Sequence, residues 1–411
     1  MRTVAQKKLC LAWLVLILTG ASHAQGNDNL SLKQAFDAAW ARQPEARAAE
    51  TRRNAADARR DAAGNWLAAQ PTLGLSDKSD RFKNNDGRRE YVVGVDLPLW
   101  LPGERSNTQA LAEAEGEAIN SRLLAAQLRV AARVREAYWN AARARVEQEV
   151  VQARLKLAER LAGDVARRVK SGDLSRADQH QADGAAASAA AALAETQSSV
   201  AQTTQVLRAL LGGAPHSVPE QPASETIPSV TVASAKHPAL REVEDRAELA
   251  RRNKALASVQ NRANPLLTVA TTRDRDSSVD AYGQTVTVAL RIPFGADNRQ
   301  RARIVNAEAD AIEAETQLEL DREALLGSID AARAYVDASR TQLAAAERRA
   351  VLARETRGFF DKSFRLGESD LPTRLRIELE AYEAERQLAQ TRIVLAQAIS
   401  QLRQALGLLP E

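Results

Sequence analysis

The chain has 411 residues, of which 45% are apolar but only 4% are aromatic, so large rings are scarce for a compact globular core of this length. Its 57 basic and 53 acidic residues give a net charge of +4 and alternate along helical stretches, which argues against a nucleic-acid-binding patch. The single cysteine excludes a disulfide framework.

Residues 1–24 have the organisation of a secretory signal peptide. Basic residues precede an apolar run over 9–18, and small residues up to Ala24 suit a cleavage site. The run is about half of the ~20 residues that a bilayer-spanning helix needs. Cys10 lies at the start of this run and not after it, so no lipid anchor is evident. We expect an exported chain whose mature part keeps 54 basic residues, because three of the 57 are removed, against 53 acidic ones.

The mature chain reads as a tandem repeat with an offset of 194 or 195 residues. Three pairs of segments resemble one another at this offset: 71–76 with 265–270, 96–99 with 291–294, and 207–212 with 402–407. Solenoid repeats are shorter, at about 20–50 residues. We place the first repeat at 25–212, a Pro-rich linker at 213–238 and the second repeat at 239–411.

Long helices are predicted where proline is absent, because proline costs about 3 kcal/mol inside a helix. No proline occurs between Pro102 and Pro215 or between Pro293 and Pro372. The expected helical stretches are 31–69, 104–170, 175–211, 239–262, 299–365 and 373–406. The two longest would each extend for about 100 Å at about 1.5 Å per residue. They are therefore too long to be buried in one small domain and must line something elongated.

Two short strands are predicted before each long helix, at 71–78, 90–99, 265–273 and 281–292. Odd positions from Tyr91 to Leu99 are apolar, and even positions are mostly small or polar. This alternation suits a membrane β-barrel strand and equally a half-buried soluble hairpin. We favour the barrel because the hairpins lie at the end of a very long helix in an exported chain. Four strands cannot close a barrel, since barrels begin at about eight strands, so several copies must share one.

Each long helix is predicted to end in a tight turn, where a basic residue and a glycine precede an acidic or hydroxyl residue. These two turns, which we call the tips, comprise Lys170, Ser171, Gly172, Asp173 and Leu174 in the first repeat, and Arg365, Leu366, Gly367, Glu368 and Ser369 in the second.

Several short motifs recur in the same order in both halves: strand-to-helix joints at 96–100 and 292–294, Leu-Gly at the end of each repeat, and helix starts at 43–45 and 237–239. With this element order, the chain over about 30–409 resembles the TolC-family outer-membrane efflux proteins. The resemblance implies a mainly α fold with a small β part. In it, a homotrimer forms a 12-stranded transmembrane β-barrel above a long α-helical barrel of coiled-coil hairpins. The short length is more similar to the cation-efflux branch.

The resemblance also implies a function. The chain would be the outer-membrane channel of a tripartite efflux system in a Gram-negative bacterium, with a periplasmic extension. It would passively conduct metal cations or drugs received from an inner-membrane transporter, of the RND type, through a periplasmic adaptor. Its other contacts would be outer-membrane lipid and its own copies, with no nucleic acid.

The tips resemble the adaptor-docking turns of that family, although ordinary helix reversal explains the same residues. Asp370, just after the second tip, is a candidate for the pore entrance. Three copies would bring three carboxylates together and attract cations there. Asp370 would equally serve as the N-cap of the following helix.

No enzyme, metal site or cofactor is predicted. His180, His216 and His237 are not spaced for ligation, and no catalytic set or phosphate-binding loop stands out. Two alternatives stay open: the same channel serving type I protein secretion, and a soluble periplasmic coiled-coil adaptor or scaffold.

Overall fold

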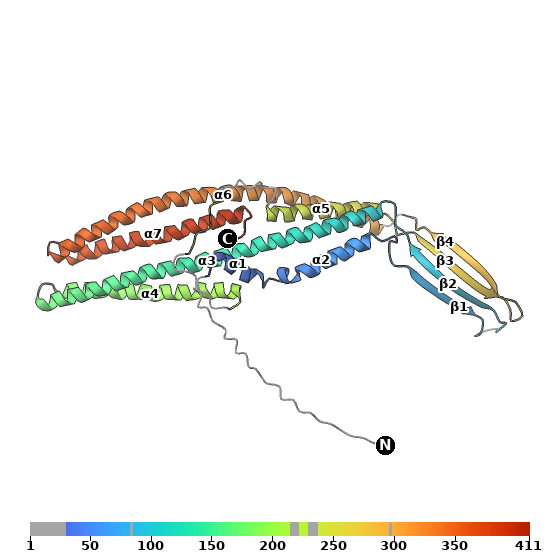
Figure 1. The fold of residues 1–411 in the computed structure, drawn as a ribbon, viewed down its shortest axis with the longest axis horizontal. Coiled ribbons are helices and arrows are strands. Elements are labelled where there is room, and N and C mark those ends of the chain that lie inside the picture. The colour runs from blue at the N-terminus through green and yellow to red at the C-terminus, as the bar shows by residue number, and fades with distance from the viewer. Residues whose placement is uncertain (1–29, 83–84, 214–221, 229–236, 296–297) are drawn as a thin grey trace, which may run out of the picture.

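The structure is a computed structural model, and it describes residues 30–82, 85–213, 222–228, 237–295 and 298–411. The predicted signal peptide and most of the predicted linker lie outside these ranges. The described chain is a long rod of helices with a small sheet projecting from one end (Figure 1). None of its helices is both long enough and apolar enough to cross a membrane.

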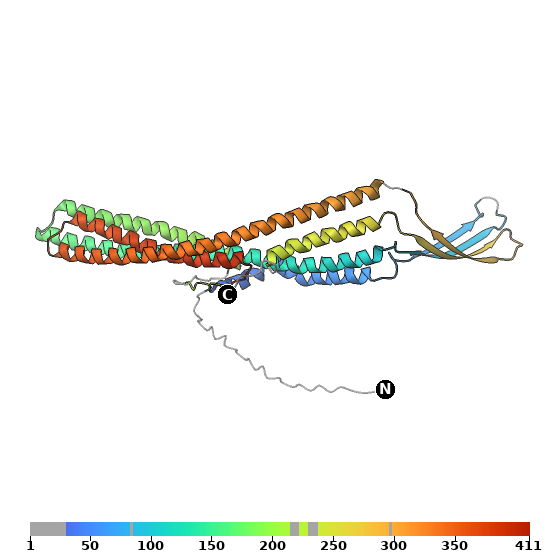
Figure 2. The same ribbon diagram turned by 90° about the horizontal axis from the view of Figure 1, so that it is seen from above.

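The described elements are, in chain order, α1 (Leu32–Trp40), α2 (Pro44–Ala63), β1 (Thr72–Ser79), β2 (Arg89–Pro98), α3 (Glu104–Ser171), α4 (Arg176–Leu211), α5 (Pro238–Val259), β3 (Leu266–Arg275), β4 (Gly283–Arg291), α6 (Asn298–Arg365) and α7 (Leu371–Ala405). The long helices α3 and α6 each have 68 residues. In Figures 1 and 2, α2 and α4 follow one another along α3, and α5 and α7 follow one another along α6. The mainly helical fold with a small sheet is therefore confirmed.

The first predicted helix, 31–69, is wrong in its continuity. The structure contains two helices there, separated by a short turn after Trp40. The cause is Pro44, which forces an extended conformation on Gln43 (ψ 142°) and takes the N1 position of α2. The second helix also ends earlier than predicted, at Ala63, and is followed by Gly64.

The four strands form one antiparallel sheet in the order β1-β2-β3-β4. Strands β2 and β3 pair along their length, from Arg89 opposite Arg275 to Pro98 opposite Leu266. The two repeats therefore meet in a single sheet, and each strand begins and ends within two residues of its predicted range. Strands β1 and β4 are the edges, and neither has an outer partner among the described residues.

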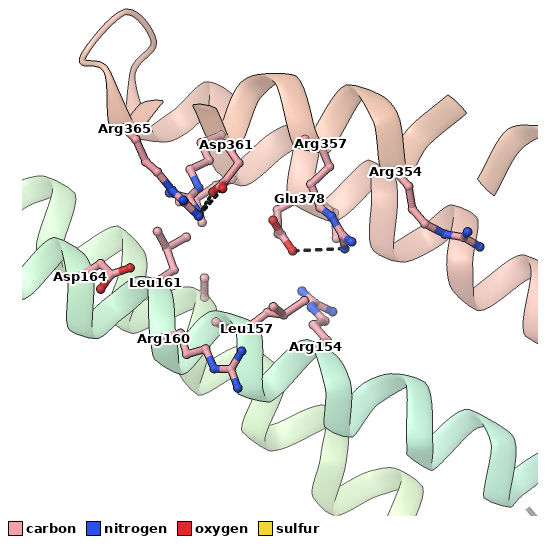
Figure 3. A pocket seen from close by; sticks show the side chains of 16 residues that line it. Arg154, Leu157, Arg160, Leu161, Asp164, Arg354, Arg357, Asp361, Arg365 and Glu378 are labelled. Carbon is pink, nitrogen blue, oxygen red and sulfur yellow. Dashed lines mark ion pairs between the residues drawn. The ribbon is translucent and has the colours of Figure 1, made fainter. Parts of the chain in front are cut away.

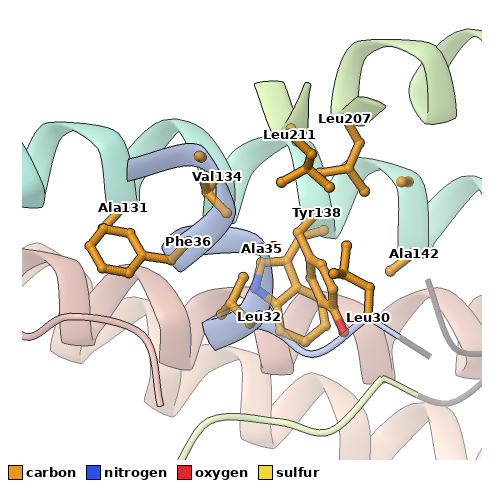
Figure 4. Packing of buried hydrophobic residues seen from close by; sticks show 14 of the residues in the cluster. Leu30, Leu32, Ala35, Phe36, Ala131, Val134, Tyr138, Ala142, Leu207 and Leu211 are labelled. Atoms are coloured by element: carbon orange, nitrogen blue, oxygen red, sulfur yellow. The ribbon is translucent and has the colours of Figure 1, made fainter. Parts of the chain in front are cut away.

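The largest apolar cluster lies near the middle of the rod, where α1 covers α3 beside the ends of α4 and α7 (Figure 4). Tyr138 and Trp139 of α3 are almost fully buried there and meet edge to face at 5.4 Å. Burial raises the pKa of the Tyr138 hydroxyl to about 12. Much of the remaining core is alanine, which lets the helices approach one another closely.

A buried charged network joins the linker to this region. Glu225, with a side chain only 3% exposed, accepts hydrogen bonds from Arg135 of α3 at 2.8 and 3.1 Å and forms an ion pair with Arg403 of α7 at 3.2 Å. The Ser400 hydroxyl also bonds this carboxylate and accepts from the Trp139 indole at 2.8 Å. One carboxylate therefore holds a loop and two helices together.

Candidate functional site

The two faces of the sheet differ in chemistry. The register places aliphatic side chains from all four strands on one face, which we call the aliphatic face: Leu73, Leu75, Val93, Val95, Leu97, Leu267, Val269, Val286, Val288 and Leu290. The opposite face, here the polar face, carries mainly small or polar side chains, including Ser76, Asp96, Thr268, Thr272, Thr285 and Thr287. Its polar groups pair across strands, as Thr268 does with Asp96 and Lys78 with Glu90.

The aliphatic face is uncovered in the single chain. Leu75 is 71% exposed, and Val286 and Val288 are each 68% exposed. A contiguous apolar surface of this kind is unfavourable in water and favourable in contact with lipid. The two open strand edges must also be paired, because lipid offers no hydrogen-bond partners to their backbone groups. The sheet therefore needs both lipid and neighbouring strands.

Aromatic side chains lie beyond both ends of the aliphatic face. At the end near the strand turns, the rings of Tyr91 and Tyr282 are 6.3 Å apart. At the helical end, near the joints between strands and helices, Trp66 is 89% exposed and Phe294 is 95% exposed. Exposed aromatic residues on both sides of an apolar band are typical of the two interfaces of a membrane.

The first tip is a helix reversal fixed by its own backbone. Gly172 adopts a φ of +85°, and the Asp173 amide donates to the Arg168 carbonyl at 2.9 Å, which closes the end of α3. Ser175 then caps α4, because its hydroxyl accepts from the Asp178 amide at 3.2 Å while the Asp178 carboxylate accepts from the Ser175 amide at 2.9 Å.

The second tip has the same geometry. Gly367 has a φ of +79°, and the Glu368 amide donates to the Ser363 carbonyl at 2.9 Å. Leu366 at its apex is 74% exposed. In the part of the chain that the structure describes, the buried hydroxyl of Ser369 has no hydrogen-bond partner. Both predicted tips lie at the same end of the rod, farthest from the sheet (Figure 1).

The structure joins the two tips through residues that the sequence analysis missed. Arg168 of α3 donates to the Phe364 carbonyl of α6 at 3.2 Å, and its guanidinium lies 5.1 Å from the Phe364 ring. Arg374 of α7 lies 4.8 Å from the same ring and pairs with Asp361 at 2.5 Å. The sequence signal that could have indicated this contact is an aromatic residue, Phe364, in the last turn of a long helix.

A cleft of about 400 Å³ lies beside this contact, between the α3–α4 and α6–α7 hairpins (Figure 3). It is lined by six arginines and three acidic residues: Arg154, Arg160, Arg354, Arg357, Arg365, Arg374, Asp164, Asp361 and Glu378. Desolvation raises the pKa of Glu378, although Arg357 and Arg374 oppose this. The cleft is thus rich in cationic groups and suits acidic side chains of a partner better than it suits metal cations.

Asp370 is the N-cap of α7. Its side chain accepts from the Thr373 amide at 3.1 Å, and the hydrogen bonds from Thr373 hold the pKa of this carboxyl below its usual range. A single chain shows this role only. The pore-entrance role of Asp370 needs three chains, and it stays a prediction.

Two substitutions separate these roles. Asp370→Asn keeps an N-cap acceptor and removes the charge, whereas Asp370→Ala removes both. If the carboxylate rings the pore, both variants should weaken cation block of the single-channel current. If the carboxylate only caps α7, Asp370→Asn should match the wild type in cation block and in thermal stability, whereas Asp370→Ala should lower thermal stability. Because the folded pKa is depressed, the cap contributes fully above the usual value of 3.8 and is lost as pH falls through the folded pKa.

The two histidines within the described ranges lie apart from these surfaces. His180 is exposed on α4, and His237 is the N-cap of α5, where its Nδ1 accepts from the Ala239 amide at 3.2 Å. His216 lies outside the described residues. Over the described ranges, no group of three or more potential donors is arranged to hold a metal ion.

Comparisons with known proteins agree with this geometry. Residues 35–213 match the family model described as "Outer membrane efflux protein". The cobalt-zinc-cadmium resistance protein CzcC of Cupriavidus metallidurans is 26% identical over 253 residues, which are 58% of this chain and 59% of that protein. The aligned part thus spans less than two thirds of this curated relative.

Solved structures share the fold over nearly the whole chain. The outer membrane protein VceC of Vibrio cholerae has a TM-score of 0.74 at 20% identity, covering 92% of this chain and 97% of its own. CusC, whose structures concern transmembrane channel formation, has a TM-score of 0.74 at 18% identity and 92% coverage of both chains. The MtrE outer membrane channel of Neisseria gonorrhoeae has a TM-score of 0.71 at 16% identity, with coverage of 92% and 89%.

Proposed function

We propose that this TolC-family outer-membrane efflux protein forms, as a homotrimer, the exit channel of a tripartite efflux system. As expected from its sequence, it lies in the outer membrane of a Gram-negative bacterium, with a helical extension in the periplasm. The matched family and structures are channels, so we assign no catalytic role to the chain.

The open sheet is the observation that carries this proposal. Its aliphatic face is exposed, its opposite face is polar, and both of its edge strands are unpaired among the described residues. In lipid, every backbone hydrogen-bonding group must be satisfied, so edge β1 of one copy must pair with edge β4 of the next. Three copies of this four-stranded sheet close a 12-stranded barrel with the polar face lining the lumen. The soluble scaffold alternative leaves the aliphatic face uncovered.

Metal cations are the substrate class that we propose. The support is the likeness to a cobalt-zinc-cadmium resistance protein over 58% of this chain. The polar face also contributes acidic side chains, among them Asp96 and Glu90, to the lumen of the barrel. Conduction is passive here, because the chain offers the ions a path and the inner-membrane transporter, which we take to be of the RND type, supplies the energy.

The tips are the proposed docking surface for the periplasmic adaptor. They lie at the end of the rod opposite the membrane sheet, about 100 Å along α3 and α6 at about 1.5 Å per residue (Figure 2). The cation-rich cleft beside them offers guanidinium groups to acidic side chains of the adaptor. The exposed Leu366 adds an apolar contact at the apex.

Replacing Gly172 and Gly367 together by valine should abolish metal resistance while the trimer still inserts and conducts. No atom lies within 4 Å of a Cβ at either glycine, so there is room for the side chain. The positive φ values of +85° and +79° nevertheless cost a β-branched residue about 1–3 kcal/mol at each site. The tips should therefore change shape without disturbing the sheet.

The measurements are growth in zinc and single-channel conductance of the purified trimer. A matched control is Gly327→Ala, in the middle of α6, where a Cβ also meets no atom within 4 Å and no positive φ is imposed. The control should keep both resistance and conductance. Full metal resistance in the double tip variant would show that the tips are not the docking surface. Loss of conductance would show that the tips are needed for assembly of the channel.

A further inference from the structure

The outer end of the aliphatic face carries a small cationic surface. Arg273 and Arg275 of β3 place their guanidinium carbons 4.7 and 4.9 Å from the ring of Tyr282. Tyr91 of β2 lies beside that ring at 6.3 Å between centroids. These four residues form what we call the rim cluster. Cation–π contacts on both arginines restrict their motion and fix them on one face of the sheet.

The position of the rim cluster follows from the period of a strand. Val269, Thr271, Arg273 and Arg275 alternate along β3 on the same face, with aliphatic neighbours as far as Thr271. At about 3.4 Å per residue, the two arginines lie about 7 and 14 Å beyond the aliphatic band. In a membrane this is the level of the lipid headgroups, where long cationic side chains and tyrosines lie.

The charge of the rim cluster is not neutralised by the chain itself. Arg89 pairs with Asp80 at 2.8 Å, and Arg88 pairs with Asp276 at 3.5 Å. Across the described residues, in contrast, Arg273 and Arg275 form no ion pair. The register places Asp77, the nearest acidic residue in the row of Arg273, two strands away, which is about 10 Å.

We propose that the rim cluster binds the phosphate groups of an outer-leaflet lipid, which rests on the proposed function as a membrane channel. Two guanidinium groups beside one another match the planar, bidentate geometry that phosphate oxygens accept. The tyrosine rings hold these groups at the height of the headgroups while the aliphatic face below contacts acyl chains. A closed homotrimer presents three such sites around the barrel.

The test uses the full-length trimer, purified in detergent and titrated with bisphosphorylated lipid A, with bound lipids counted by native mass spectrometry. Arg273→Gln with Arg275→Gln should weaken binding by about tenfold for each arginine lost, which is the effect of a charge-assisted hydrogen bond. Arg273→Lys with Arg275→Lys keeps the positive charges but removes the planar, bidentate donors of the guanidinium groups. This variant should therefore show an intermediate loss of lipid binding.

Arg88→Gln is the matched control, because Arg88 directly precedes β2 at the same end of the sheet and already pairs with Asp276. It should bind lipid A as the wild type does. Equal binding by the wild type and the Gln double variant overturns the inference, as does undiminished binding of dephosphorylated lipid A. Displacement by inorganic phosphate at low concentration would mean an ion site and not a lipid site, and would overturn the inference as well.

Trimer mass and single-channel conductance, measured on the same samples, separate this inference from the proposed function. If the wild-type trimer conducts but binds lipid A no better than the Gln double variant does, only the lipid site is contradicted. A wild type that neither trimerises nor conducts contradicts the channel itself.

Discussion

Val288→Arg should abolish insertion of the trimer into the outer membrane. Val288 lies in the middle row of the aliphatic face, opposite Val269, and its side chain is 68% exposed in the single chain. An arginine at the midplane of a barrel's lipid face costs about 2–4 kcal/mol. The cost is incurred three times per trimer, at an edge strand that must also pair with the next copy. We expect loss of the protein from the outer-membrane fraction and complete loss of metal resistance.

Thr287→Arg is the matched control, since it is the neighbouring residue on the same strand with its side chain on the polar face. It should insert normally and lower the cation selectivity of the channel, because three positive charges then line the lumen. Membrane fractionation and reversal potentials in a salt gradient measure the two effects. If Val288→Arg inserts as well as Thr287→Arg does, then the aliphatic face does not contact lipid.

Glu225→Ala should destabilise the assembled protein by about 3–5 kcal/mol, the usual effect of removing one partner from a buried ion pair. The glutamate side chain is 3% exposed, and the side chains of Arg135 and Arg403 are each 5% exposed, so two guanidinium groups would lose their buried counter-ion together. The described linker segment would also lose its anchor on α3 and α7. Thermal unfolding of the detergent-solubilised trimer, followed by circular dichroism, measures the change.

Two further variants make this test specific. Glu115→Ala removes an exposed ion pair with Arg59, whose side chain is 63% exposed, and should cost less than about 1 kcal/mol. Adding Arg135→Met to Glu225→Ala removes one uncompensated charge and should recover part of the lost stability. If Glu225→Ala and Glu115→Ala unfold at the same temperature, the buried network contributes little to stability.

Local patterns in the sequence were sufficient for the strands, the long helices and the tips. Alternation along 91–99 specified which side chains share a face, because a strand has a period of two residues. Gly172 and Gly367 marked the tips because a helix commonly ends at a residue with positive φ, which glycine adopts without cost. The predicted resemblance to TolC-family outer-membrane efflux proteins was confirmed by the family match and the shared fold.

Contacts between distant segments were not predictable in the same way. Glu225 is one acidic residue in a Pro-rich linker without periodicity, so nothing local indicated that it meets Arg135 and Arg403. The contact of Arg168 with Phe364 joins residues 196 positions apart and depends on how two hairpins lie together. The break before α2 was different, because Pro44 signalled it and the helical composition around it was given too much weight.

The equal length of the two long helices restricts which insertions and deletions either helix can accept. Each has 68 residues, and both hairpins end at the same level (Figure 2). In the proposed trimer, an adaptor would therefore meet an even ring of turns. Seven residues inserted into α3 alone would displace one turn by about 10 Å along the axis, while its counterpart stayed in place. Changes in the length of such a chain must therefore occur in pairs, one in α3 and one in α6, and in steps that preserve the phase of the apolar stripe.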